Sequence, residues 1–102
     1  MKIYIAGKIT GDRHYERKFR KAEKRLLKLG HSVMNPAWLK DCKDFTWKNY
    51  MNVSRVMQEQ CDATFFLSDW MNSKGAKEEF LYADKLHQRK FYSLKEVPKI
   101  DK

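Results

Sequence analysis

The sequence predicts an α/β domain in which a parallel sheet is covered by helices on both faces. Short segments rich in β-forming residues alternate along the chain with segments whose apolar residues recur at helical spacing. The resulting order, β-α-β-α-β-α-β, favours parallel strands joined by right-handed crossovers. A third observation concerns size: 102 residues without a repeat or linker predict one domain over residues 1–102.

The first predicted strand covers residues 2–6, and the first predicted helix covers residues 13–29. Asp12 is the candidate N-cap of this helix, and Gly30 is placed to end it. Spacings of four, three, four and three between apolar residues predict one buried helix face, made of Tyr15, Phe19, Ala22, Leu26 and Leu29.

The second strand is predicted at residues 31–35, closed by Pro36, and a polar irregular connection follows over residues 37–44. The second helix is expected to start near Asp44 or Thr46. One stripe of this helix consists of Trp47, Tyr50, Ser54, Met57 and Cys61.

The apolar run before residue 69 predicts a buried third strand at 63–68, followed by a third helix from about 73 to 87. A fourth strand is predicted at residues 90–94, with a polar tail from about 95. Ligands of such sheets bind outside the carboxyl ends of the strands. That edge is expected to receive the connections 7–11, 35–36 and 69–75.

The charge and hydropathy of the chain limit the kinds of partner and the cellular location that we expect. The net charge is +9, and eight of the 22 basic residues lie on the helix predicted at 13–29. We interpret this helix as a solvated surface, because no aromatic residues alternate with the charges to stack bases, and nucleic acid is not the expected partner. No apolar run approaches the roughly 20 residues that span a bilayer, and no signal peptide is recognised, so we expect a cytoplasmic protein.

Neither the cysteines nor the histidines predict a metal site. Cys42 and Cys61 lack metal-ligand spacing with each other or with a histidine, so both are expected to be reduced structural thiols. No metal and no cofactor is expected.

Two polar residues stand out within the predicted helices. Ser54 interrupts an apolar stripe, and its hydroxyl either bonds back to the preceding turn or faces a cavity; spacing leaves both open. At 100° per residue, Glu79 lies within about 40° of Ala83 and about 60° of Ala76, on the border of the buried face. Geometry alone favours an ordinary helix-terminal or ion-paired role for Glu79 over a chemical one.

Three segments of the chain form a recognisable set, accompanied by a mid-chain Trp47, Tyr50 and Met51. The segments are Tyr4-x-x-Gly7-x-Ile9-x-Gly11, Cys61-Asp62-Ala63 and Ser73-x-Gly75-x-x-x-Glu79-x-x-x-Ala83. Together they resemble the nucleoside 2-deoxyribosyltransferase superfamily, in particular its compact, uncharacterised bacterial and phage branch. The similarity extends from Lys2 to about Phe91.

The resemblance implies a flavodoxin-like, Rossmann-like three-layer fold and chemistry at an N-glycosidic bond. Glu79 matches the position of the superfamily's nucleophile, which forms a glycosyl-enzyme ester. Tyr4 matches the tyrosine that orients that nucleophile. Gly7, Ile9 and Gly11 match the loop that wraps base and sugar. No cofactor is implied.

The resemblance also bears on the substrate. Ser73 and Gly75 follow the pattern of nucleotide hydrolases, in which they hold a 5′-phosphate at a helix start. Ser54 departs from the pattern, because the superfamily usually has an Asp there that contacts the sugar and assists the leaving base. Asp69 and Asp44 are candidates to replace it, and we include Asp69 among the expected substrate-binding residues.

The sequence therefore predicts hydrolysis or transfer at the N-glycosidic bond of a (deoxy)nucleoside 5′-monophosphate. The alternative is a protein of the same fold that binds or sequesters a nucleotide without cleaving it, which Ser54 favours; a nucleic-acid-binding module ranks third. The resemblance implies a homodimer or larger homo-oligomer. The segment around Trp47, Tyr50 and Met51 is expected either at that interface or in the core.

Overall fold

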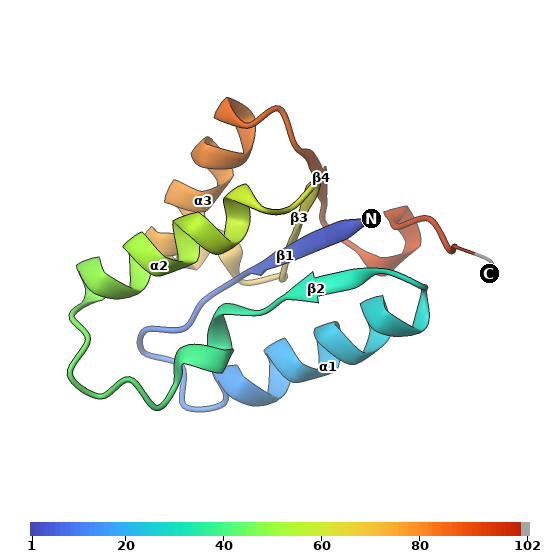
Figure 1. The fold of residues 1–102 in the computed structure, drawn as a ribbon. Helices are drawn as coiled ribbons and strands as arrows, with labels where there is room; N and C mark the ends of the chain where they lie inside the picture. The colour runs from blue at the N-terminus through green and yellow to red at the C-terminus, as the bar shows by residue number, and fades with distance from the viewer. Residues whose placement is uncertain (101–102) are drawn as a thin grey trace.

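The computed structural model describes residues 1–100 and confirms a flavodoxin-like α/β fold (Figure 1). Its sheet has four strands in the order β2-β1-β3-β4, and every neighbouring pair is parallel. The chain moves outward from β1 first to β2 on one side and later to β3 on the other, so the strand order reverses between β1 and β3, which is where sheets of this class usually have a crevice. The strands are β1 (Lys2–Ala6), β2 (Ser32–Met34), β3 (Ala63–Phe66) and β4 (Arg89–Phe91).

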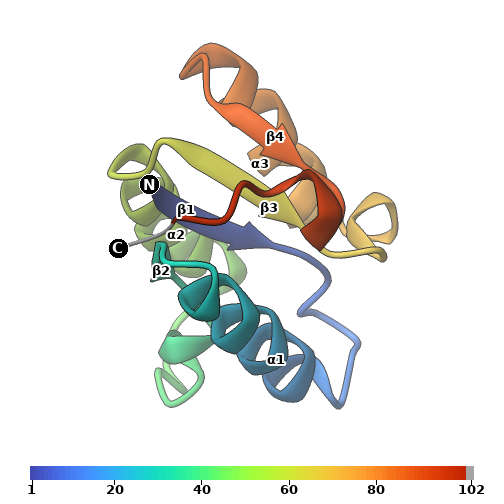
Figure 2. The same ribbon diagram turned by 90° about the vertical axis from the view of Figure 1, so that its right-hand side faces the viewer.

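Helices cover both faces of this sheet (Figure 2). Helix α1 (Tyr15–Lys28) lies on one face, and α2 (Trp47–Glu59) and α3 (Lys74–Lys85) lie on the other. Successive side chains of a strand point to opposite faces. Ile3 and Ile5 of β1 therefore join the core under α1, whereas Tyr4 faces the core under α2 and α3.

Of the N-caps predicted for the first two helices, the structure confirms one and corrects the other. Thr46 caps α2 as expected: its hydroxyl accepts a hydrogen bond from the Asn49 N–H, and the Asn49 side chain accepts one from the Thr46 N–H. Asp12 was the expected cap of α1, but that helix begins at Tyr15, with His14 at the N-cap position. Asp12 accepts a hydrogen bond from the His14 N–H in the preceding turn instead.

The C-terminal residues, which the sequence predicts to be a polar tail, pack against the domain. Val97 is buried in the core under α1, and the Ile100 N–H donates to the Leu29 carbonyl at 2.8 Å. Gly30 ends α1 as predicted, with φ at +96°, and a side chain there would meet the Ile100 carbonyl oxygen at 2.8 Å. Two isolated apolar residues, Val97 and Ile100, in a polar stretch are a weak signal, so the sequence did not indicate this packing.

Cys42 and Cys61 are both free thiols. Burial raises the pKa of the Cys61 thiol to about 11, which makes it a poor nucleophile. Within residues 1–100, no three His, Cys, Asp or Glu side chains cluster as a metal site would require. No helix in that range is long and apolar enough to cross a membrane.

Candidate active site

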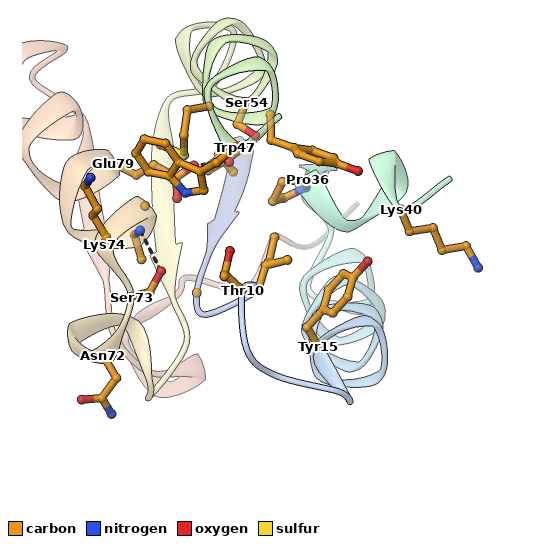
Figure 3. Close-up of a pocket in the computed structure, with 17 residues that line it drawn as sticks. Thr10, Tyr15, Pro36, Lys40, Trp47, Ser54, Asn72, Ser73, Lys74 and Glu79 are labelled. Carbon is orange, nitrogen blue, oxygen red and sulfur yellow. Dashed lines mark hydrogen bonds between the residues drawn. The ribbon is translucent and has the colours of Figure 1, made fainter. Parts of the chain in front are cut away.

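A cavity of about 680 Å³ opens at the carboxyl-end edge of the sheet, between the loop after β1, the start of α1, and the first turns of α2 and α3 (Figure 3). Seven of the nine site residues expected from the sequence line it. They are Tyr4, Gly7, Ile9, Ser54, Ser73, Gly75 and Glu79.

Glu79 and Tyr4 form the buried floor of this cavity. The Tyr4 hydroxyl donates a hydrogen bond to Oε2 of Glu79. Glu79 is 7% exposed and Tyr4 is fully buried. The two residues come from α3 and β1, 75 positions apart, so the fold itself assembles the pair.

Burial dominates the electrostatics of this pair. It raises the pKa of Glu79 to about 8, although the Tyr4 hydrogen bond acts in the opposite direction. Burial and the Glu79 charge together raise the pKa of Tyr4 well above its usual range. The ionised Glu79 is therefore a carboxylate stripped of most of its water, which is the state of an activated nucleophile.

Ser54 faces the cavity, which decides between the two alternatives that spacing left open. It is buried at 5% exposure and lines the cavity beside the floor pair. Hydrogen bonding from Ser54 lowers the pKa of Tyr4, opposing the effect of burial. The hydroxyl lies beside the Tyr4–Glu79 pair and has no proton to release at neutral pH.

The N-terminus of α3 forms one end of the cavity. Ser73 is its N-cap, and the Ser73 Oγ accepts a hydrogen bond from the Ala76 N–H at 3.1 Å. Capping uses the oxygen as an acceptor and leaves the hydroxyl proton free to donate. Lys74 also lines the cavity, with its ammonium 4.7 Å from the centre of the Trp47 ring. First-turn N–H groups, a hydroxyl and an ammonium suit an anion.

Two expected binding residues, Asp69 and Gly11, do not line the cavity. The Asp69 carboxylate accepts a hydrogen bond from the Lys8 N–H at 3.0 Å and forms an ion pair with Lys18. Lys18 also pairs with Asp12, so these contacts hold the loop after β1 against the connection that follows β3. Asp69 therefore supports one wall of the cavity without reaching into it.

An aromatic wall was missed as part of the site. Figure 3 shows Tyr15 on the opposite side of the opening from Lys74. Trp47, Tyr50 and Met51 line the cavity, a place that neither the interface nor the core interpretation anticipated. Helical period marked Tyr15 as a core residue but gave no information on which elements its ring would meet. The other lining residues missed are Thr10, Pro36, Lys40, Asn72, Lys74 and Ala76.

Gly7 lets the loop after β1 pass close to the end of β3. A Cβ at this position would lie 2.8 Å from Cδ1 and 3.0 Å from Cβ of Leu67. We expect Gly7→Ala to lower the free energy of unfolding by about 1–3 kcal/mol through overpacking, measured by urea denaturation. Gly11→Ala is the comparison: of the described residues only the Lys8 side chain would lie near its Cβ, and the expected loss of about 1 kcal/mol comes from the φ of +82°. A Gly7→Ala variant as stable as wild type would contradict this close approach.

The sequence model of one protein family, described as "Domain of unknown function (DUF4406)", matches residues 1–92. The chain belongs to this family. The DUF4406 match includes every residue that lines the cavity, whereas the C-terminal segment with Val97 lies outside it. No curated protein matches the chain.

Proposed function

We propose that the protein cleaves or exchanges the N-glycosidic bond of a (deoxy)nucleoside 5′-monophosphate through a covalent glycosyl-Glu79 intermediate. The observation that carries the proposal is the buried Glu79 carboxyl, held by the Tyr4 hydroxyl on the floor of a cavity of about 680 Å³. Ligand pockets range from about 300 to 1,000 Å³. The resemblance to nucleoside 2-deoxyribosyltransferases supports the same assignment of both residues.

The chemistry proceeds in two displacements at the anomeric carbon. An oxygen of the Glu79 carboxylate bonds to C1′ as the C1′–N bond breaks, and the electron pair of that bond stays on the base nitrogen. Water then attacks C1′, releases the carboxylate and loses one proton, which balances the proton taken up by the departed base and completes hydrolysis; attack by a second base completes transfer. Both displacements invert C1′, so the overall outcome is retention.

Protonation of the leaving base is the weak step of this scheme. Among the described residues, Glu79 is the only carboxylic acid that lines the cavity, and Ser54 has no proton to give. We assign the proton taken up by the base to water. A positioned general acid typically contributes about 10²–10⁴ in rate, and its lack makes the reaction slow.

Ser54 equally supports the second candidate, a protein that binds the nucleotide without cleaving it. The pKa of about 8 at Glu79 points the same way, because it keeps most of that carboxyl protonated at pH 7. Chromatography for free base after incubation with each (deoxy)nucleoside monophosphate separates the two. Released base supports the enzyme; binding measured by calorimetry, without released base, supports the binder.

We expect a 5′-monophosphate to release its base at least about tenfold faster, in kcat/KM, than the matching nucleoside. The reason is the cavity end formed by Ser73, Lys74 and the first N–H groups of α3, which offers an anion the positive end of the helix dipole. Lys74→Gln is expected to reduce this preference. Lys77→Gln is the control, since Lys77 is exposed one turn later and does not line the cavity. Equal rates with nucleoside and monophosphate would rule out a phosphate site at this helix.

A further inference from the structure

Helix α2 carries a second buried polar residue one turn after Ser54. Gln58 is fully buried, and its Nε2 donates two hydrogen bonds. One goes to Oγ1 of Thr64 on β3 at 3.1 Å, and the other goes to the backbone carbonyl of Glu79 at 2.9 Å. A single side chain of α2 thus contacts both the sheet and the nucleophile position of α3.

These bonds belong to a closed network. The Thr64 hydroxyl donates to Oε1 of Gln88 at 2.7 Å. Nε2 of Gln88 in turn donates to the backbone carbonyls of Gln58 at 2.8 Å and Cys61 at 2.9 Å. The network therefore joins α2, β3, α3 and the residue that precedes β4.

We infer that Gln58 is a positioning residue that sets where Glu79 stands relative to Tyr4. Thr64 is the direct register partner of Tyr4 across β1 and β3. The Gln58 amide donates one hydrogen bond to Thr64 and one to the backbone of Glu79. It therefore fixes the distance between the sheet at Tyr4 and helix α3 at Glu79. The inference rests on the proposed role of Glu79 as nucleophile.

Stability alone does not call for a glutamine at this position. Oε1 of Gln58 is buried without a hydrogen-bond partner among residues 1–100, which is unfavourable. Both acceptors of its Nε2 keep partners without it: Thr64 bonds to Gln88, and the Glu79 carbonyl lies inside α3, where the N–H four residues on is its partner. An apolar side chain of similar size would leave no new polar group unsatisfied. What it would lose is the fixed position of Glu79.

The test is Gln58→Met, with Gln60→Met as the matched control. Gln60 lies just after the same helix, but it is exposed, and within residues 1–100 its amide donates only to the Val56 carbonyl at 3.3 Å. For Gln58→Met we expect a urea midpoint equal to or above wild type. We also expect a kcat for base release about ten- to hundredfold lower, with KM within about twofold. Gln60→Met is expected to match wild type in all three.

A second readout does not depend on turnover. The Tyr4 hydrogen bond lowers the pKa of Glu79, so loosening it in Gln58→Met is expected to raise that pKa above about 8. Carbon-13 NMR titration of the Glu79 carboxyl measures this in wild type and variant. An upward shift supports the inference even if wild type releases no base, an outcome that would remove the proposed function alone. An unchanged titration midpoint, or a lower urea midpoint with kcat per folded molecule unchanged, overturns it.

Discussion

Glu79→Gln is expected to abolish base release and, above pH 8, to make the protein more stable than wild type. An amide oxygen is a far weaker nucleophile than a carboxylate, and removing a nucleophile costs about 10⁴-fold or more in rate. The glutamine still presents an oxygen that accepts the Tyr4 hydrogen bond, so the floor of the cavity stays closed. Loss of activity then reflects chemistry and not collapse of the site.

The stability gain follows from the direction of the Glu79 pKa shift. Folding raises this pKa from 4.5 to about 8, so the native state binds the proton more tightly than the unfolded state does. The favourable contribution is complete below about pH 4.5 and is lost as pH rises through 8. Burying the charge costs on the order of 4 kcal/mol by then. Glutamine never ionises, so the variant escapes this cost.

Urea denaturation at pH 5 and pH 9, together with chromatography for free base, measures both effects. At pH 5 the two proteins are expected to have similar stability; at pH 9 the variant is expected to be the more stable. Glu78→Gln is the control, because Glu78 is the neighbouring carboxylate and its charge is only a minor cause of the Glu79 pKa shift. Base release that survives in Glu79→Gln would refute the nucleophile. Equal stabilities at pH 9 would refute the burial of its charge.

Helical phase predicted the surroundings of Glu79 but not its role, which was predicted only by the resemblance to nucleoside 2-deoxyribosyltransferases. The phase placed Glu79 beside two small residues, Ala76 and Ala83, and the structure buries all three. The helices were predicted from apolar residues at helical spacing and the strands from short runs of β-forming or apolar residues, because both are local properties of the chain. Ends were less accurate: β3 stops at Phe66 and not at residue 68.

The missed residues depend on how elements pack against each other, which periodicity does not contain. Lys74 and Trp47 meet only because α2 and α3 lie side by side on one face of the sheet. One local feature indicated that Gln58 is buried: it lies four residues after Ser54 and next to Met57, on the buried side of α2. Its partners on β3 and α3 were beyond prediction, because they are set by the tertiary arrangement.

Ser54→Asp is expected to raise base release by about 10²–10⁴ at pH 7. The new carboxyl would lie beside the Tyr4–Glu79 pair, in a place where Ser54 is 5% exposed. Two carboxylates in one buried site cannot both ionise, so their pKa values separate. One group then stays protonated and serves as the general acid for the leaving base, while the other ionises and attacks C1′.

The control for this gain is Ser54→Asn, because asparagine has nearly the same size as aspartate but no acidic proton to transfer. Both variants add a buried polar group and are expected to lose about 1–3 kcal/mol of stability, measured by urea denaturation. Single-turnover release of free base, corrected for the folded fraction, then isolates the acid. If aspartate and asparagine change the rate equally, Ser54 does not occupy the position of the missing acid. If only aspartate accelerates release, protonation of the leaving base and not the reactivity of Glu79 limits the rate of the wild-type protein.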